Sequence, residues 1–160
     1  MSISISTQLP VIRNIEEAAE LCHDFDAVIT AGPEKDEVAG WGHPNHLVVS
    51  FDDVTNDKYG QAPTLEQVRG IVEWGAKQIG STLVHCHAGI SRSTACAWGI
   101  AIAKGFDPRE ALESLAEMHP EDSGWGQRTF RPNPLIVKHL EVILGRNDLG
   151  KILDQVAKGF

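Results

Sequence analysis

The fold of this chain is decided by one stretch of its sequence, Leu83-Val84-His85-Cys86-His87-Ala88-Gly89-Ile90-Ser91-Arg92-Ser93-Thr94. Its first two residues are typical of a buried strand, and the apolar run over residues 95–103 is typical of a helix. Where a strand passes through a tight loop into a helix, backbone N–H groups converge and the helix dipole favours negative charge. The stretch therefore predicts an anion-binding loop between a strand and a helix.

The residue types in this loop suit attack on a phosphoryl group. A cysteine is nucleophilic as the thiolate, which a helix N-terminus and a nearby cation favour, and Cys86 has Arg92 six positions after it. The guanidinium of Arg92 can match two phosphate oxygens at once. Gly89 permits a positive φ or a close approach to the anion. We expect Ser93 to donate a hydrogen bond to the thiolate and His85 to orient the cysteine from behind. The phosphate-binding residues predicted are His87, Ala88, Gly89, Ile90, Ser91 and Arg92.

The pattern His85-Cys86-x-x-Gly89-x-x-Arg92-Ser93 is similar to the HCxxGxxR(S/T) signature of the cysteine-dependent protein tyrosine phosphatases. The lack of long insertions resembles their small, bacterial-type dual-specificity branch. The resemblance covers roughly residues 25–144 and implies an α/β fold with a central, mostly parallel sheet flanked by helices. It also implies two chemical steps: Cys86 attacks phosphorus, and water then hydrolyses the cysteinyl-phosphate. No cofactor and no metal are expected, because Arg92 and the loop amides stabilise the charge.

Such a reaction needs an acid to protonate the leaving oxygen. The family places an aspartate on a loop upstream of the cysteine, and Phe51-Asp52-Asp53 follows a predicted strand over residues 46–51. This run resembles the acid loop of the phosphatases of regenerating liver and small bacterial relatives, where the second aspartate is the acid. Asp53 precedes Cys86 by 33 positions (86 − 53), a separation typical of the family. We therefore predict Asp53 as the acid, with Asp52 and then Asp57 as alternatives.

A second candidate segment runs over residues 124–133. In the dual-specificity branch an arginine and a Pro-Asn pair lie beside the phosphate loop, which makes Arg128, Arg131 and Asn133 secondary candidates together with Asp52. Ile136 stands where the family usually has phenylalanine, so the register stays open. The alternative is a solvated loop that ends in a helix-capping asparagine.

Composition limits the class of protein. The 160 residues are 42% apolar, enough for one globular domain over residues 1–160. The net charge of −8 argues against nucleic-acid and anionic-membrane partners. Three cysteines suit a reducing compartment, and residues 1–11 lack the features of a signal peptide, so a cytoplasmic protein is expected. Nothing in the sequence indicates an oligomeric state.

The remaining pattern predicts alternating strands and helices. Asn14 with Glu17, Thr64 with Gln67, and Asp107 with Pro108 are helix-start signals. We expect an edge strand over residues 3–9, strands over 26–30 and 46–51 and near Leu83, a loop over 34–45, a helix that ends at Gly105, and helices near 134–144 and 149–156.

The predicted function is hydrolysis of phosphotyrosine, with phosphoserine and phosphothreonine as further candidates, in a phosphorylated protein or peptide. The variable loop positions carry no fixed positive charge, which disfavours polyphosphorylated lipids and RNA 5′ ends. Three alternatives stay open: a catalytically silent phosphate-binding module, a phosphatase of non-protein phosphomonoesters, and redox chemistry at Cys86 with Cys22 or Cys96. A metal site formed by His85-Cys86-His87 with His43 and His46 is disfavoured, because neighbouring strand residues point to opposite faces.

Overall fold

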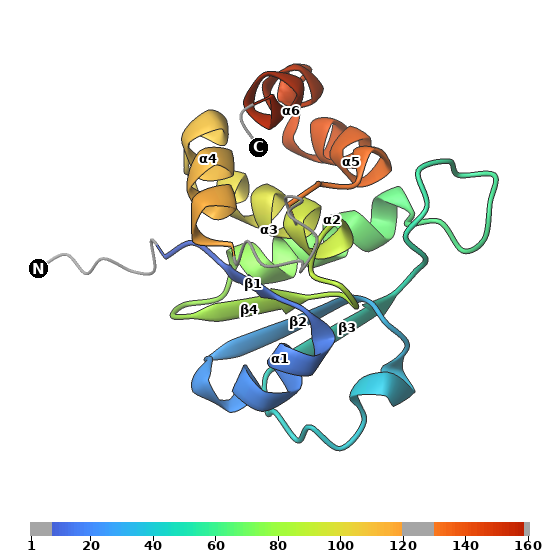
Figure 1. Ribbon diagram of the computed structural model, residues 1–160, viewed down its shortest axis with the longest axis vertical. Coiled ribbons are helices and arrows are strands. Elements are labelled where there is room, and N and C mark those ends of the chain that lie inside the picture. Colours follow the sequence, from blue (N-terminus) through green and yellow to red (C-terminus); the bar gives the residue numbers. More distant parts are fainter. Residues whose placement is uncertain (1–7, 120–129, 159–160) are drawn as a thin grey trace, which may run out of the picture.

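The computed structural model describes residues 8–119 and 130–158. Its centre is a four-stranded parallel sheet in the order β1-β4-β2-β3 (Figure 1). The strands are β1 (Val11–Arg13), β2 (Ala27–Gly32), β3 (His46–Ser50) and β4 (Thr82–His85). The predicted α/β fold with a mostly parallel sheet is confirmed.

Helices cover both faces of the sheet (Figure 1). On one face lies α1 (Ile15–Leu21), which continues into the short 3-10 helix η1 (Cys22–Asp24). On the other face lie α2 (Leu65–Ala76), α3 (Arg92–Ala103), α4 (Pro108–Met118) and α5 (Pro134–Leu144), with α6 (Leu149–Ala157) packed on α4 and α5. A second 3-10 helix, η2 (Lys35–Val38), follows β2.

The helix-start signals of the sequence act as predicted. Asn14 and Thr64 each accept a hydrogen bond from the N–H three residues later, and in both helices the third residue returns the contact, as a capping box. Asp107 caps α4, which has Pro108 in its first turn. Each cap satisfies N–H groups that a helix leaves unpaired at its start.

Helix α3 is the central helix of the core. Every residue from Arg92 to Ala101 is buried, including Trp98, whose indole N–H donates to the carbonyl of Pro108 at 2.8 Å. Small residues allow this close packing: a Cβ at Gly99 would come within 2.3 Å of Leu140. The loop before α3 therefore sits on an element that its surroundings hold in place.

Two predictions of local structure are corrected. Gln8 and Leu9, the described part of the strand expected over residues 3–9, precede the first strand, and Val11–Arg13 instead pair with Leu83–His85 of β4. The expected loop over residues 34–45 contains η2, because a capping box of Glu34 and Glu37 closes one helical turn.

All four strands end at the same edge of the sheet, because they are parallel. The segments that follow them start at Asn14, Pro33, Phe51 and Cys86. In open parallel sheets, ligands bind at the carboxyl ends of the strands. The candidate residues after β3 and β4 therefore meet at this edge.

Candidate active site

The loop between β4 and α3 has its carbonyl groups held from outside. The Cys86 carbonyl contacts the His85 ring at 2.9 Å, and the His87 carbonyl accepts from the Ile15 N–H at 2.9 Å. The Gly89 carbonyl contacts the His119 ring at 2.6 Å. The carbonyls of Ile90 and Ser91 accept from the N–H groups of Arg131 at 2.9 Å and Asn133 at 3.1 Å, and both also accept from the Thr94 hydroxyl.

Within the described part of the chain, the N–H groups of Ala88, Ile90 and Ser91 have no acceptor. The loop can therefore offer these amides to an anion.

Gly89 is required where this loop passes β1. Its φ is +72°, and a Cβ there would lie 2.8 Å from the carbonyl carbon of Arg13. A side chain would be strained by its φ and would meet backbone. The Gly89 N–H instead points into the loop and donates to Cys86 Sγ at 3.2 Å.

Cys86 is 2% exposed, and Ser93 Oγ also lies 3.2 Å from its Sγ. The structure thus places Ser93 at the sulfur, where the sequence analysis expected it, and adds the Gly89 amide as a second neighbour. Both are donors that can stabilise a thiolate.

His85 contacts Cys86 from behind and is completely buried. Burial lowers its pKa to about 4, so its ring is neutral near pH 7. Nδ1 must carry the proton, because the Cys86 carbonyl at 2.9 Å can only accept. The Thr30 hydroxyl, 2.6 Å from Nε2, is therefore the donor to that nitrogen.

The hydrogen-bond chain continues outward from Thr30 to the ring of His46, whose Nε2 lies 2.7 Å from the same hydroxyl. Burial lowers the pKa of His46 as well. The indole of Trp41 stacks on the ring of His46, with centroids 5.7 Å apart, and packs at a tilt of 34° against the ring of His85, with centroids 5.0 Å apart. Thr30 has no motif signal in the sequence, since it reaches the site only through the pairing of β2 with β4.

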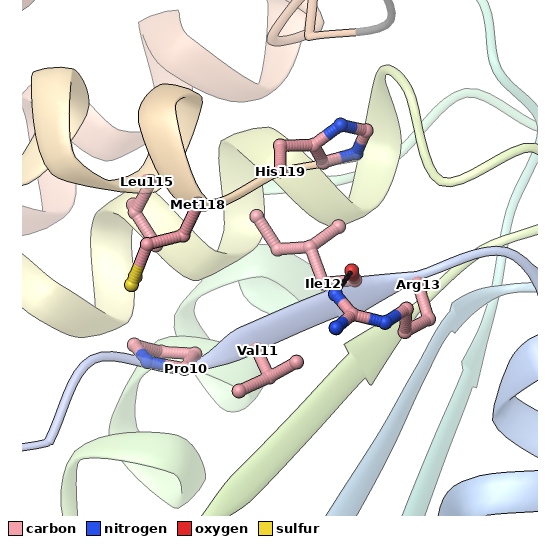
Figure 2. Close-up of a pocket in the computed structure, with 7 residues that line it drawn as sticks. All are labelled: Pro10, Val11, Ile12, Arg13, Leu115, Met118 and His119. Carbon is pink, nitrogen blue, oxygen red and sulfur yellow. Dashed lines mark hydrogen bonds between the residues drawn. The ribbon is translucent and has the colours of Figure 1, made fainter. Parts of the chain in front are cut away.

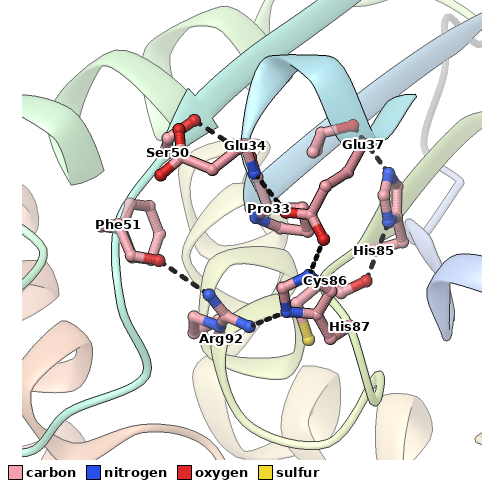
Figure 3. A network of polar contacts seen from close by, with 10 residues as sticks. Pro33, Glu34, Glu37, Ser50, Phe51, His85, Cys86, His87 and Arg92 are labelled. Carbon is pink, nitrogen blue, oxygen red and sulfur yellow. Dashed lines mark hydrogen bonds and ion pairs between the residues drawn. The ribbon is translucent and has the colours of Figure 1, made fainter. Parts of the chain in front are cut away.

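Arg92 is buried with its guanidinium at the mouth of the loop (Figure 3). One terminal nitrogen donates to the Phe51 carbonyl at 2.7 Å, and the other donates to His87 Nδ1 at 2.9 Å. Its Nε is buried and has no partner among the described residues. A buried N–H without a partner is costly, and a phosphate oxygen would supply the acceptor.

His87 also contacts a residue that the sequence analysis missed. Its Nε2 lies 2.6 Å from Oε1 of Glu37 on η2, and this hydrogen bond is the main cause of the lowered pKa of Glu37 (Figure 3). Both residues stand 50 positions apart in the chain, so no local pattern joins them.

The two neighbouring aspartates after β3 lie in different surroundings. Asp53 Oδ1 accepts from the Ser91 hydroxyl and the Asn133 amide, each at 2.8 Å, which holds Asp53 beside the loop between β4 and α3. Asp52 turns to its own loop, where Oδ2 accepts from the Gln61 N–H at 2.8 Å. The geometry therefore favours Asp53 over Asp52 as the acid, and its role stays a prediction.

Within the described part of the second candidate segment, the side chain of Asn133 reaches the site. It is fully buried, and its side-chain oxygen caps α5 while its amide contacts Asp53. Arg131 contacts the loop through its backbone, and its side chain is exposed. Arg128 lies outside the described residues. The site prediction and the helix-cap interpretation of Asn133 are therefore compatible.

The histidines and cysteines considered for other chemistry have separate contacts. His43 bonds the Phe25 carbonyl at 2.8 Å, and no group of three or more metal-ligand side chains gathers within residues 8–119 and 130–158. Cys22 and Cys96 are free and buried. Burial raises the pKa of Cys96 far above its ordinary value, which makes it a poor thiolate.

A hollow of about 150 Å³ lies between β1 and α4 (Figure 2). Its lining is mostly apolar and consists of Pro10, Val11, Ile12, Arg13, Leu115, Met118 and His119. His119 links it to the site, because the same ring contacts the Gly89 carbonyl.

Comparisons with known proteins bear on the fold. No protein-family model and no curated protein sequence matches the chain. The structure is similar to Tk-PTP in the active form, with a TM-score of 0.58 and 22% identity over 92% of this chain and 100% of that one. It is similar to DUSP15, with a TM-score of 0.60 and 20% identity over 98% and 96% of the two chains. PTPMT1 matches with a TM-score of 0.57 and 20% identity over 96% and 98%.

At these identities the likeness shows the fold alone, which is that of the small dual-specificity phosphatases, as the sequence resemblance implied. Of the helices in the described parts of the chain, none has the length and apolar character to span a membrane.

Proposed function

We propose that this chain hydrolyses phosphomonoesters through a cysteinyl-phosphate, without a metal, and that phosphotyrosine in proteins or peptides is its substrate class. The observation that carries the proposal is the surroundings of Cys86. Its loop has amides without an acceptor among the described residues, and the buried Arg92 has an N–H without one there. Asp53, from the segment after β3, is hydrogen-bonded to the same loop through Ser91. Such preorganised donors stabilise the charge of a transferring phosphoryl group.

In the first step the Cys86 thiolate attacks phosphorus and the bond from phosphorus to the leaving oxygen breaks. Asp53 protonates that oxygen through Oδ2, which has no hydrogen-bond partner among the described residues. The loop amides and Arg92 bind the phosphoryl oxygens. The products are the alcohol or phenol, the cysteinyl-phosphate and an Asp53 carboxylate.

In the second step water attacks phosphorus and the sulfur–phosphorus bond breaks. The Asp53 carboxylate accepts a proton from the water, which restores the acid for the next cycle. The Ser93 hydroxyl, 3.2 Å from the sulfur, donates to the departing thiolate. Inorganic phosphate leaves, and no co-reactant is needed.

The substrate class rests on the charges around the loop. The variable loop positions offer no lysine or arginine, and the imidazole of His87 is paired with the Glu37 carboxylate. Further phosphate groups on a substrate would find an anion there. A phosphatase of non-protein phosphomonoesters is the second candidate, and it has a precedent in the fold: PTPMT1 has been crystallised in complex with PI(5)P.

The test is hydrolysis of p-nitrophenyl phosphate, phosphotyrosyl peptides and phosphoinositides from pH 4.5 to 8, with EDTA present. We expect Cys86→Ser to be inactive and Asp53→Asn to lose about 100-fold in kcat, together with the alkaline limb of the pH profile. Asp52→Asn is the matched control and should retain activity within about threefold, since a general acid's contribution is far larger.

Three outcomes would contradict parts of the proposal. Absence of turnover in the wild type, with phosphate binding intact, would favour a silent binding module. Loss of turnover with EDTA would indicate a metal, and faster hydrolysis of phosphoinositides than of peptides would replace the substrate class.

A further inference from the structure

Arg92 can bind a phosphate through two N–H groups only if one edge of its guanidinium faces the anion. Three contacts set that orientation, of which Figure 3 shows those with Phe51 and His87. The Phe51 carbonyl accepts from one terminal nitrogen at 2.7 Å, and His87 Nδ1 accepts from the other at 2.9 Å. The backbone of Gly32 lies against the group, where a Cβ would come within 2.2 Å of the first nitrogen. Nε has no partner among the described residues, and each terminal nitrogen carries a second N–H beyond the one used in these contacts. The edge that bears Nε therefore offers donors to an anion.

The contact with His87 depends on one tautomer of the imidazole. Arginine has only donors, so Nδ1 of His87 must carry a lone pair to accept from Arg92. The proton of the neutral ring is then on Nε2, which lies 2.6 Å from Oε1 of Glu37. A carboxylate at that distance accepts a hydrogen bond from the Nε2 N–H and stabilises this tautomer, as carboxylates do for metal-bound histidines.

Glu37 is itself held in place. Its other oxygen accepts from the Glu34 N–H at 2.7 Å, within the capping box of η2. The turn that leads into η2 is tied to the end of β3, where the Ser50 hydroxyl donates to the Pro33 carbonyl at 3.0 Å. The hydrogen bond from His87 lowers the pKa of Glu37, so the group is a carboxylate near neutral pH.

We propose that Glu37 and His87 are positioning residues for Arg92: the Glu37 carboxylate selects the His87 tautomer, and that tautomer holds the guanidinium with its Nε edge toward the phosphate. The inference rests on the proposed function, because it names the phosphate as the ligand of Arg92. Neither side chain has a hydrogen bond to Cys86 or Asp53 among the described residues. Their effect is to hold a flexible side chain in its binding orientation before the phosphate arrives, which lowers the entropic cost of binding.

The proposal and simple electrostatics predict opposite changes in phosphate affinity when the Glu37 carboxylate is removed. Removing a carboxylate near an anion site should strengthen anion binding, because a like charge is lost. If Glu37 instead positions Arg92, its removal should weaken binding. Asp36 is the matched control: it is a neighbouring carboxylate on the same helix, exposed, and with no hydrogen bond from its side chain to any described residue.

The experiment is titration of inorganic phosphate into Cys86→Ser protein by calorimetry, so that the readout needs no turnover. In this background we expect His87→Ala to raise the dissociation constant about tenfold and Glu37→Ala about fivefold, the scale of one charge-assisted hydrogen bond. His87→Asn should rescue binding to within about threefold, because its side-chain oxygen can replace Nδ1 as the acceptor. Asp36→Ala should leave the constant unchanged or lower it. In the active background, kcat/KM should fall by a comparable factor.

The double variant Glu37→Ala/His87→Ala decides whether the two residues act in series. A relay predicts that the double variant binds phosphate no more weakly than His87→Ala alone. Effects that multiply, or tighter binding in Glu37→Ala, would overturn the proposal. Each variant's unfolding midpoint is measured alongside, and weakened binding with a wild-type midpoint supports positioning. If Cys86→Ser binds phosphate as described while the wild type hydrolyses no phosphomonoester, the proposed function fails and the positioning role stands.

Discussion

Lowering the pH should destabilise this protein through His85. The buried ring has a pKa of about 4, against the ordinary 6.5, because burial disfavours its charged form. In the unfolded chain the ring takes up a proton as the pH falls below 6.5, whereas in the folded protein it stays neutral down to about 4. The unfolded state therefore binds more protons across this window, and stability is lost as the pH falls through it.

The size of the loss follows from the two pKa values. A difference of about 2.5 units (6.5 − 4) corresponds to about 3 kcal/mol once the pH is below both values. At pH 5, where the unfolded ring is almost fully protonated and the folded ring is not, the loss relative to pH 8 is about 2 kcal/mol. His46, whose pKa is also lowered by burial, adds to the loss with the same sign.

The assay is urea unfolding of wild type and His85→Gln at pH 8 and pH 5. Glutamine can still accept from the Thr30 hydroxyl but does not titrate. The variant lacks the ring that packs against Trp41, so it should be less stable than the wild type at pH 8. Between pH 8 and pH 5, the wild type should lose about 2 kcal/mol more than the variant. Equal losses of stability in the wild type and His85→Gln would refute the reasoning, since they would show that His85 takes up its proton at the same pH in the folded and unfolded states.

Two further substitutions test the site. Gly32→Ala places a Cβ 2.2 Å from the Arg92 guanidinium at a φ of +117°, so the phosphate affinity measured by calorimetry should fall at least tenfold. Gly40→Ala is the control, because its φ is also positive, at +88°, but its Cβ would meet open space, and it should bind phosphate normally. Equal affinity in both would contradict the packing of Arg92 on Gly32. Asn133→Ala removes the cap of α5 and one donor to Asp53, so urea unfolding should show a loss of about 1–2 kcal/mol and kcat should fall. Asn133→Ser keeps a capping oxygen but is too short to reach Asp53, so it should recover the stability and not the kcat.

The loop between β4 and α3 could be predicted from the sequence because its parts are neighbours in the chain. The positive φ of Gly89, the contact of Ser93 with Cys86 and the helix that starts at Arg92 all follow from spacing within one strand, loop and helix. Helix starts such as Asn14 and Asp107 are equally local, since a cap joins residues three positions apart. The choice of Asp53 over Asp52 came from a family resemblance, and the structure adds the physical contacts that favour it.

What holds the loop was decided only by the tertiary structure. The contact of Thr30 with His85 joins residues 55 positions apart, Glu37 with His87 joins residues 50 apart, and Asp53 with Asn133 joins residues 80 apart. None of these pairs has a spacing that helix or strand geometry would bring together. The first two pairs meet because β2 and β4 are parallel neighbours whose ends share one edge of the sheet. Asn133 reaches Asp53 from the start of α5. The sequence by itself determined which groups could do chemistry on a phosphate, and the packing of the sheet determined which side chains keep those groups in position.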